Sequence, residues 1–497
     1  MQFPPTAARP DPPPGPYVVA GLGRAGLAAV RRLVEQVGAR AIAAWDGPAS
    51  DSARAAARSL EEEGVRVAFG GDGLELLDPL PAPRCVVKSP GIPPDVPLLK
   101  AARMRGLAVI DELEFGWRLE RRPVIAVTGT NGKSTVATLA AAVLRAAGAR
   151  AALAGNIERG PALSGLRPSD ADVVVCEVSS FQLEACPAFL PEVAVLTNLS
   201  GDHLNRHGTM RRYGSVKRSM FVRGSACVPL AVVGVGDRFG AALADDVESR
   251  GGAVHRYGTG ASADYRIEAC RSTVQTSWFA AATPTEPLEL RTRLPGRHNA
   301  LNALAAVALA DALRIPRARA TAAIAAARGV PGRFEAIPGS QPFDVVVDYA
   351  HNSDGVRSAL ETARAVIQER RGRLRVVCSM PNFRYREQRR AVARTAALLA
   401  DDLVLTSERW PGSDESGVPD GLEQGAREAG RDNWNVVLDR RAAIERTLCA
   451  ARPGDLVAIL GRGAQDGELV DGHGRLEPFD DRCVARQALE RIGRSGS

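Results

Sequence analysis

The feature that most constrains the fold is a glycine-containing loop between an apolar run and a long Ala/Leu-rich stretch. Residues 124–127 form an apolar run typical of a strand, the loop reads Thr128-Gly-Thr-Asn-Gly-Lys-Ser-Thr135, and a helical pattern continues to residue 147. A strand, a glycine loop and a helix in this order surround phosphate oxygens with backbone N–H groups and a helix N-terminus. In such a loop Lys133 would reach the β- and γ-phosphates, and Ser134 would hold Mg²⁺.

The loop departs from the general phosphate-binding pattern GxxxxGK[ST] at one position. The pattern requires glycine at position 127, which is valine here. The alternative interpretation is an ordinary strand–turn–helix corner. Phosphate binding, which favours ATP as the ligand, predicts contacts from one run of residues: Gly129, Thr130, Asn131, Gly132, Lys133, Ser134 and Thr135.

The chain has 497 residues, and at about 150 residues per domain this length predicts three domains. We expect an α/β fold with a Rossmann-like N-terminal domain at 17–119, a P-loop-type central ATPase domain at 120–328 and a Rossmann-like C-terminal domain at 329–497. In the last domain, strand-like runs at 343–347, 375–378, 403–405 and 456–460 alternate with helical stretches. The Pro-rich residues 1–16 are expected to form a disordered lead-in.

A second glycine loop, Gly21-Leu-Gly-Arg-Ala-Gly26, lies between an apolar run at 17–20 and a helical pattern at 27–37. The next apolar run, 41–45, ends at Asp46. This order is the fingerprint of a dinucleotide fold, for which a nicotinamide cofactor is one candidate ligand. Ser89-Pro-Gly-Ile-Pro93 follows the run at 85–88, at the strand end where open α/β sheets bind ligands.

Three further groups of the predicted central domain are candidates to face the phosphate loop. Glu177 ends the apolar run 173–177, Asp202-His203 follows the run 193–196, and Lys217 lies fourteen residues beyond His203. A strand-terminal acid beside a phosphate loop suits a Mg²⁺ ligand. The alternatives are a helix-capping glutamate and a surface histidine.

The basic residues are used unevenly. Of 64 lysines and arginines only Lys88, Lys100, Lys133 and Lys217 are lysine. Arginine stays protonated and cannot replace a reactive amine. Lys133 and Lys217, which lie inside motifs described above, are therefore candidates for a chemical role. The net charge of +7 suits anionic substrates, and no dense basic tract indicates nucleic acid.

Composition also predicts the compartment. No apolar run reaches the roughly 18 residues of a membrane span, and residues 1–16 lack a signal-peptide pattern. The eight cysteines are scattered, with no CxxC pair, which is typical of reduced structural thiols. We therefore expect a cytoplasmic protein with no membrane partner.

Taken together, these motifs resemble the Mur ligase family over essentially the whole chain after Pro16. The resemblance rests on the phosphate loop, Asp202-His203, Lys217 and three further motifs: Gly155-Asn-Ile157, Glu177-Val-Ser-Ser-Phe-Gln-Leu-Glu184 and Leu294-Pro-Gly-Arg-His-Asn-Ala300. It implies an ATP- and Mg²⁺-dependent amide ligase that joins a free amino acid to a UDP-linked muramoyl carboxylate through an acyl phosphate. In that role the glycine loop at 21–26 would bind the UDP pyrophosphate.

The resemblance also implies a role for each matching residue. The catalytic residues would be Lys133, Glu177, His203 and Lys217. Two Mg²⁺ ions would be held by Ser134, Glu177, His203 and a carbamylated Lys217. The nucleotide would contact Asn299, Arg333 and Asp348. The uridine diphosphate would contact Gly23, Asp46, Ser89 and Gly91, and the muramoyl–peptide path would be lined by Asn156, Ser179 and Gln182. The incoming amino acid's carboxylates would be bound by Arg384, Arg386 or Arg409, although each of these could instead be a solvated surface residue.

Within the family, the first two predicted domains look most like the ligase that adds D-glutamate to UDP-N-acetylmuramoyl-L-alanine. The third segment, with Asp348-Tyr-Ala-His-Asn352, Gly461-Arg-Gly-Ala-Gln465 and Phe479-Asp-Asp-Arg482, is more similar to the third-residue ligase, but it has Thr406-Ser-Glu-Arg-Trp-Pro411 where that ligase has Asp-Asn-Pro-Arg. We predict glutamate, D or L, as the amine, and a monomer. A third-residue or secondary-metabolite ligase, and a nucleotide-sugar- or NAD-binding protein, are the alternatives.

Overall fold

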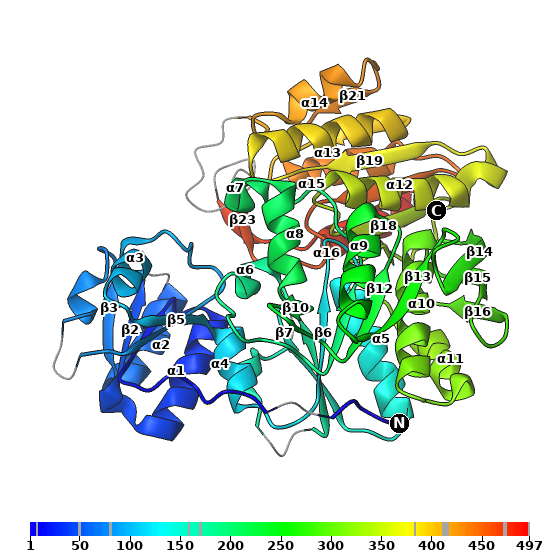
Figure 1. Cartoon of the computed structure of the whole chain (residues 1–497). Helices are drawn as coiled ribbons and strands as arrows, with labels where there is room; N and C mark the ends of the chain where they lie inside the picture. The colour runs from blue at the N-terminus through cyan, green and yellow to red at the C-terminus, as the bar shows by residue number, and fades with distance from the viewer. Residues whose placement is uncertain are drawn as a thin grey trace.

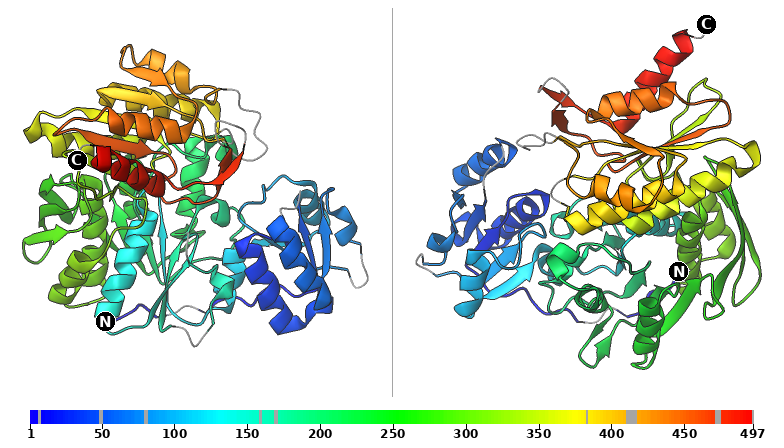
Figure 2. Two further views of the ribbon diagram at one scale, coloured as in Figure 1. Left: turned by 180° about the vertical axis from the view of Figure 1, so that it is seen from behind. Right: turned by 90° about the horizontal axis from the view of Figure 1, so that it is seen from above.

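The computed structural model describes residues 1–5, 8–47, 51–78, 82–157, 160–167, 171–381, 384–409, 417–470 and 475–495. Three separate sheets follow one another along the chain. The first domain lies to one side, and the C-terminal domain rests on the central domain (Figure 1, Figure 2). The prediction of three α/β domains is confirmed. The boundaries at 119 and 328 remain predictions, and each falls between two sheets.

The first sheet is parallel and has the order β3-β2-β1-β4-β5. Its strands are β1 Tyr17–Ala20, β2 Ile42–Asp46, β3 Arg66–Phe69, β4 Cys85–Lys88 and β5 Ala108–Asp111. Its helices are α1 Arg24–Val37, α2 Asp51–Glu62, α3 Pro97–Met104 and α4 Glu112–Leu119. The strand order changes direction between the parallel neighbours β1 and β4, so the Gly21 and Ser89 loops lie together at the carboxyl edge of the sheet.

The central sheet has the order β16-β15-β14-β13-β12-β9-β6-β8-β7. Its strands are β6 Val124–Thr128, β7 Ala151–Gly155, β8 Val173–Glu177, β9 Val193–Leu196, β12 Leu230–Gly234, β13 Ala253–Gly258, β14 Tyr265–Ser272, β15 Ser277–Ala282 and β16 Leu288–Thr292. The helices are α5 Lys133–Ala146, α6 Ser180–Leu183, α7 Leu204–His207, α8 Met210–Arg218, α9 Arg238–Glu248, α10 Arg297–Ala312 and α11 Arg317–Ala326. Helices α5, α10 and α11 pack on one face, and α9 packs on the other.

The C-terminal sheet has the order β17-β18-β22-β19-β20-β21. Its strands are β17 Glu335–Ala336, β18 Asp344–Asp348, β19 Leu374–Cys378, β20 Asp402–Leu405, β21 Trp434–Val436 and β22 Leu456–Leu460. The helices are α12 Ser353–Ile367, α13 Arg386–Leu399, α14 Leu422–Glu428, α15 Arg440–Cys449 and α16 Asp481–Ser495. Two small ladders complete the fold, β10 Val222–Arg223 with β11 Ala226–Cys227 and β23 Glu468–Val470 with β24 Leu476–Pro478. In the part of the chain that is described, no helix combines the length and apolarity that a bilayer crossing requires.

The lead-in was expected to be disordered, and this expectation is wrong at Arg9. The Arg9 guanidinium is buried, and it donates to the carbonyls of Trp117, Glu120 and Arg122 at 3.3, 2.7 and 3.0 Å. It also pairs with the buried Glu192 at 2.8 Å. These groups flank the junction between the first two domains, so polar contacts hold the segment there although it forms neither helix nor strand.

We expect Arg9→Ala to lower the free energy of unfolding by about 3–5 kcal/mol, because it leaves the carboxylate of Glu192 buried without its cation. The matched control is Arg105→Ala, whose partner Asp78 lies on the surface with 68% of its side chain exposed, so little change is expected. Urea unfolding followed by circular dichroism measures both. Equal midpoints for the two variants would show that Arg9 stabilises nothing.

Candidate active site

A cavity of about 450 Å³ lies over the phosphate loop, between the central and C-terminal domains. Ten of the residues predicted from the sequence line it together: Thr130, Asn131, Gly132, Lys133, Ser134, Thr135, Glu177, Asn299, Arg333 and Asp348. They come from β6–α5, β8, α10 and the start of the C-terminal domain. Residues more than 200 positions apart in the sequence therefore build one site.

Two glycines of the loop occupy backbone conformations that side chains rarely adopt. Gly129 has φ +148°, and a Cβ there would lie 1.8 Å from Thr197 Oγ1. Gly132 has φ +87°, and a Cβ there would meet Asn302 Oδ1 at 2.4 Å. Glycine at these positions lets the loop fold closely against β9 and α10, with α5 beginning at its end.

Lys133 and Ser134 begin helix α5 and face the cavity. Lys133 Nζ donates to the carbonyls of Gly129 and Thr130 at 3.2 and 2.8 Å, and burial lowers the pKa of Lys133. Ser134 Oγ donates to Glu177 Oε2 at 2.7 Å. Asn156, at the end of β7, donates to the other oxygen of Glu177 at 3.4 Å. The strand-end acid thus lies directly beside the phosphate loop, as predicted.

Lys217 lies beneath the loop on α8 and is 1% exposed. Its Nζ donates to the Gly129 carbonyl at 2.7 Å and lies 4.7 Å from the ring of Tyr213. Burial first, and then the charge of Lys133, holds the pKa of Lys217 well below its usual range. Among the described residues no carboxylate forms an ion pair with this buried amine, which is unusual for a structural lysine.

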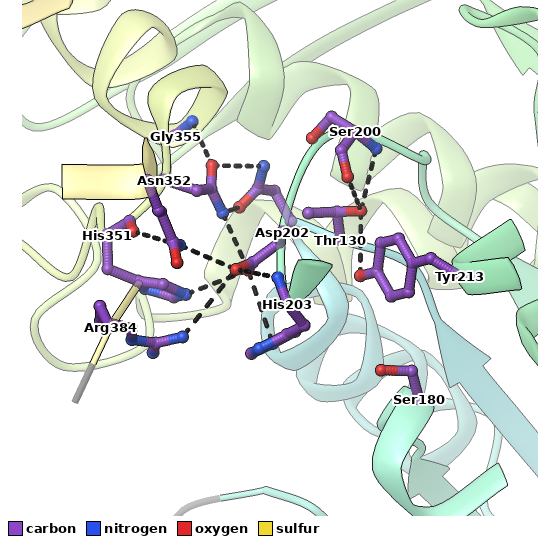
Figure 3. Close-up of polar contacts among 12 residues, drawn as sticks. Thr130, Ser180, Ser200, Asp202, His203, Tyr213, His351, Asn352, Gly355 and Arg384 are labelled. Carbon is purple, nitrogen blue, oxygen red and sulfur yellow. Dashed lines mark hydrogen bonds and ion pairs between the residues drawn. The ribbon is translucent and has the colours of Figure 1, made fainter. Parts of the chain in front are cut away.

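His203 follows β9 and lies beside the loop (Figure 3). Its backbone is left-handed, with φ 54°, and its Nε2 lies 3.5 Å from Asp202 Oδ2. Burial, only partly opposed by Asp202, lowers the pKa of His203 to about 3. A neutral imidazole at neutral pH keeps a nitrogen lone pair that can bind a metal.

The residues around the phosphate loop could bind Mg²⁺ with one or two side-chain oxygens, and they do not surround it with a full set of protein ligands. Among the described residues no three His, Cys, Asp or Glu side chains gather as a metal site. The adjacent oxygens of Ser134 and Glu177 suit Mg²⁺, which takes one or two protein oxygens and completes its shell with phosphates and water. The free amine of Lys217 donates hydrogen bonds and cannot hold a cation in this form, so the second predicted metal site remains a prediction.

The opposite end of the cavity presents groups for a nucleoside. Asn299 is held by the Pro295 carbonyl at 2.7 Å. Asp348 Oδ2 accepts from the Phe334 amide at 2.6 Å, and burial, opposed by Arg333, raises the pKa of Asp348 to about 6. The sequence reasoning missed further lining residues: Thr197, Asn198, Asp237, Tyr257, His298, Asn302, Tyr349 and His351. His298, Tyr349 and His351 lie inside motifs already noted, which was the available signal.

The first-domain residues form a separate group at the carboxyl edge of their sheet. Asp46 accepts from the amides of Leu22 and Gly47, both at 2.8 Å, and Ser89 donates its amide to Ala20. Gly23 precedes α1, and Gly91 lies in the Ser89 loop. None of these residues lines the cavity, so the substrate they would bind must extend from the first domain toward the phosphate loop.

Lys88 connects the first domain to the central one. Lys88, at the end of β4, pairs with Asp111 at 2.8 Å, and both side chains are fully buried. Its Nζ also lies 3.5 Å from the Phe181 carbonyl of the central domain. Ser179 and Gln182 form a capping box around α6, and their contact with substrate remains a prediction.

The predicted arginines of the third domain do not form one cluster. Arg384 Nη1 lies 3.9 Å from Asp202, beside the cavity. Arg386 pairs with Asp420 at 2.7 Å on the surface, away from the site. The backbone of Arg409 pairs with β23, and Trp410 and Pro411 of the same motif lie outside the described residues.

A buried ionic cluster at the carboxyl edge of the third sheet was not predicted. Arg440 pairs with Asp481 at 2.7 Å. It also donates to the Ser379 hydroxyl at 2.5 Å, and this hydroxyl donates to Glu408 at 2.5 Å. Arg462 lies 3.7 Å from Glu408. Arg462 and Asp481 of this cluster lie in the motifs at 461–465 and 479–482, which were the only sequence feature that pointed to it.

Comparison with known proteins agrees with this geometry. Residues 127–310 match the Mur ligase middle domain, and residues 332–463 match the Mur ligase, glutamate ligase domain. UDP-N-acetylmuramoylalanine–D-glutamate ligase of Gloeobacter violaceus is 36% identical over 320 residues, which are 64% of this chain and 68% of the relative. UDP-N-acetylmuramoyl-L-alanyl-D-glutamate–2,6-diaminopimelate ligase of Syntrophomonas wolfei is 31% identical over 409 residues, or 77% and 81% of the two chains.

Solved structures share the fold. The crystal structure of UDP-N-acetylmuramate-alanine ligase MurC from Thermotoga maritima aligns with a TM-score of 0.60 at 22% identity, covering 96% of this chain and 99% of that chain. At this identity the likeness concerns the fold alone. It includes all three domains, among them the first, which the two matched family domains leave out.

Proposed function

The chain belongs to the Mur ligase family, and on that premise we propose that it adds glutamate to UDP-N-acetylmuramoyl-L-alanine in peptidoglycan precursor synthesis. The reaction class, ATP-dependent amide ligation, follows from the family. The observation that carries the proposal is the grouping of Lys133, Ser134 and Glu177 in a cavity that the C-terminal domain covers. Such a cavity brings the phosphoryl donor, the carboxylate that accepts the phosphoryl group and the attacking amine together away from water.

The reaction has two steps, phosphorylation of the carboxylate and attack by the amine. A carboxylate oxygen of the UDP-linked substrate attacks the γ-phosphorus of ATP, ADP leaves, and an acyl phosphate forms. The amine nitrogen then attacks the acyl carbon and loses a proton, and the carbon–oxygen bond to phosphate breaks. Lys133 would turn from its carbonyl partners to the transferring phosphoryl group, where a fixed cation stabilises the developing charge.

Mg²⁺, when bound, neutralises phosphate charge and polarises the transferring group. Ser134 and Glu177 would hold one ion, and His203 with a modified Lys217 would hold the second. Asn156 orients Glu177 from the other side through its amide. Arg333 and Asp348, which line the same cavity, would bind the nucleoside.

We further propose that Lys217 is carbamylated. In its unprotonated form Nζ would attack carbon dioxide, forming a nitrogen–carbon bond, and the displaced proton would pass to solvent. The product is a carboxylate-like ligand that arginine cannot become. The buried amine beside the phosphate loop, in a chain that otherwise uses arginine, supports this step.

The first domain would bind uridine diphosphate at Gly23, Asp46, Ser89 and Gly91, and the muramoyl–peptide part would pass Asn156, Ser179 and Gln182. The third domain would bind the amino acid, with Arg384 as the best-placed cation for its carboxylate. A different amine is the second candidate, since 77% of the chain aligns with UDP-N-acetylmuramoyl-L-alanyl-D-glutamate–2,6-diaminopimelate ligase of Syntrophomonas wolfei. We propose a cytoplasmic monomer, in a compartment that supplies ATP.

Phosphate release with UDP-N-acetylmuramoyl-L-alanine, measured with each of four amines in turn, tests the proposal. D-Glutamate or L-glutamate is expected to support turnover, while meso-diaminopimelate and L-lysine are expected to give only the rate without amine. Turnover with no glutamate isomer would contradict the proposed substrate. Turnover when UDP-N-acetylmuramoyl-L-alanyl-D-glutamate and diaminopimelate are supplied instead would move the protein to the third-residue step.

A further inference from the structure

One buried carboxylate of the central domain is surrounded by side chains of the C-terminal domain. Asp202, in the loop after β9, is 1% exposed. Its Oδ1 accepts from Gln388 Nε2 at 2.8 Å. Its Oδ2 lies 3.4 Å from Asn352 Nδ2 and 3.5 Å from His351 Nε2. Together with Arg384 at 3.9 Å, these groups come from the end of β18 and the start of α13 (Figure 3).

The same carboxylate holds the neighbouring His203. The His203 amide donates to Asp202 Oδ1 at 2.8 Å, and the imidazole Nε2 lies 3.5 Å from Oδ2. These contacts accompany the left-handed backbone of His203, a conformation that a non-glycine residue adopts only where its surroundings fix it.

A second contact joins the C-terminal domain to the phosphate loop at the same place. Asn352 and Asn131 exchange amide hydrogen bonds at 3.0 and 3.3 Å. Asn352 also accepts from the Gly355 amide as the N-cap of α12, so its position is fixed by that helix. The segments that begin α12 and α13 therefore contact the phosphate loop at Asn131, and they contact Asp202, which in turn holds His203.

We propose that Asp202 is a positioning residue that couples docking of the C-terminal domain to the placement of His203 and the phosphate loop. The proposal rests on the proposed function, because it concerns the same site. With the C-terminal domain undocked, Asp202 would lose Gln388, His351, Asn352 and Arg384 as partners and would face water. Docking buries the carboxylate, which is unfavourable unless all these donors are in place. The carboxylate thereby favours a single docked arrangement.

Hydrogen exchange in the presence of Mg²⁺ and a non-hydrolysable ATP analogue tests the coupling directly. Asp202→Asn keeps the shape but turns one acceptor oxygen into a donor that faces other donors. We expect amides at 384–390 and 349–355 to exchange at least tenfold faster in this variant than in the natural protein. Gln388→Ala is expected to act in the same direction, and the double variant should exchange no faster than Asp202→Asn alone.

The control is Arg390→Ala on the same helix, because Arg390 pairs with Glu428 inside the C-terminal domain at 2.6 Å. It should leave exchange and turnover unchanged. Turnover should fall by about 10²-fold in Asp202→Asn. Thermal melting excludes variants that fail to fold.

Unchanged protection in Asp202→Asn would overturn the proposal, as would additive effects of Asp202→Asn and Gln388→Ala. The exchange readout needs neither the UDP-linked substrate nor an amine. If the glutamate assignment fails, turnover with glutamate disappears while the exchange result stands. A failure of the coupling and a failure of the proposed function are therefore distinguishable.

Discussion

Lys133→Ala is expected to lower kcat for phosphate release by about 10³-fold or more. Groups that stabilise charge on a transferring phosphoryl are worth about 10³–10⁵ in rate. Lys133 begins α5 and lines the cavity, where its Nζ donates to the Gly129 and Thr130 carbonyls of the loop.

Lys133→Arg is expected to lose nearly as much, because a planar guanidinium cannot occupy the space of a compact ammonium within the loop. Lys100→Ala is the matched control, since Lys100 is an exposed lysine on α3 of the first domain. Steady-state phosphate release and calorimetric ATP binding measure all three. Activity of Lys133→Ala within tenfold of the natural protein would show that this loop does not stabilise the transferring phosphoryl.

Lys217→Arg is expected to lower turnover by about 10³-fold, because the variant keeps a cation where a carboxylate-like ligand is required. Lys217→Ala should be equally inactive but partly restored by acetate or propionate, which would occupy the place of the carbamate. Lys217 is 1% exposed, so circular dichroism and ATP binding must first show that the variants fold.

The modification has a signature independent of activity. Supplied with ¹³C-bicarbonate, the natural protein should give a carbamate carbon signal by NMR that is absent from Lys217→Ala and present in Lys100→Ala. Lys88 provides an internal comparison, because it is buried in a pair with Asp111 and should stay an ammonium. Full turnover of Lys217→Arg, or a protein without the signal, would contradict carbamylation.

The phosphate loop and its neighbours were predictable because each follows a short, fully buried parallel strand. Such strands read as continuous apolar runs, and the predicted run 173–177 coincides with β8, with Glu177 at its end. Helix α10 begins at Arg297, after Gly296, so the motif at 294–300 contains the start of this helix.

The contacts between domains could not be predicted. Asp202 and Gln388 are 186 positions apart, and nothing local in either segment indicates the other. The half-buried strands β14, β15 and β16 were also missed. Their alternating exposure gives a weaker sequence signal than a continuous apolar run. The Pro-rich composition of residues 1–16 concealed one buried arginine, because composition does not reveal a single long-range ion pair such as Arg9–Glu192.

The central claim, ATP-dependent amide formation through an acyl phosphate, is tested most directly by isotope transfer. UDP-N-acetylmuramoyl-L-alanine labelled with ¹⁸O in its carboxylate is incubated with ATP, Mg²⁺ and glutamate, and the products are analysed by mass spectrometry. We expect one ¹⁸O atom in each phosphate released, with ADP as the other product. Amide product accompanied by unlabelled phosphate, or label recovered in AMP, would contradict the account.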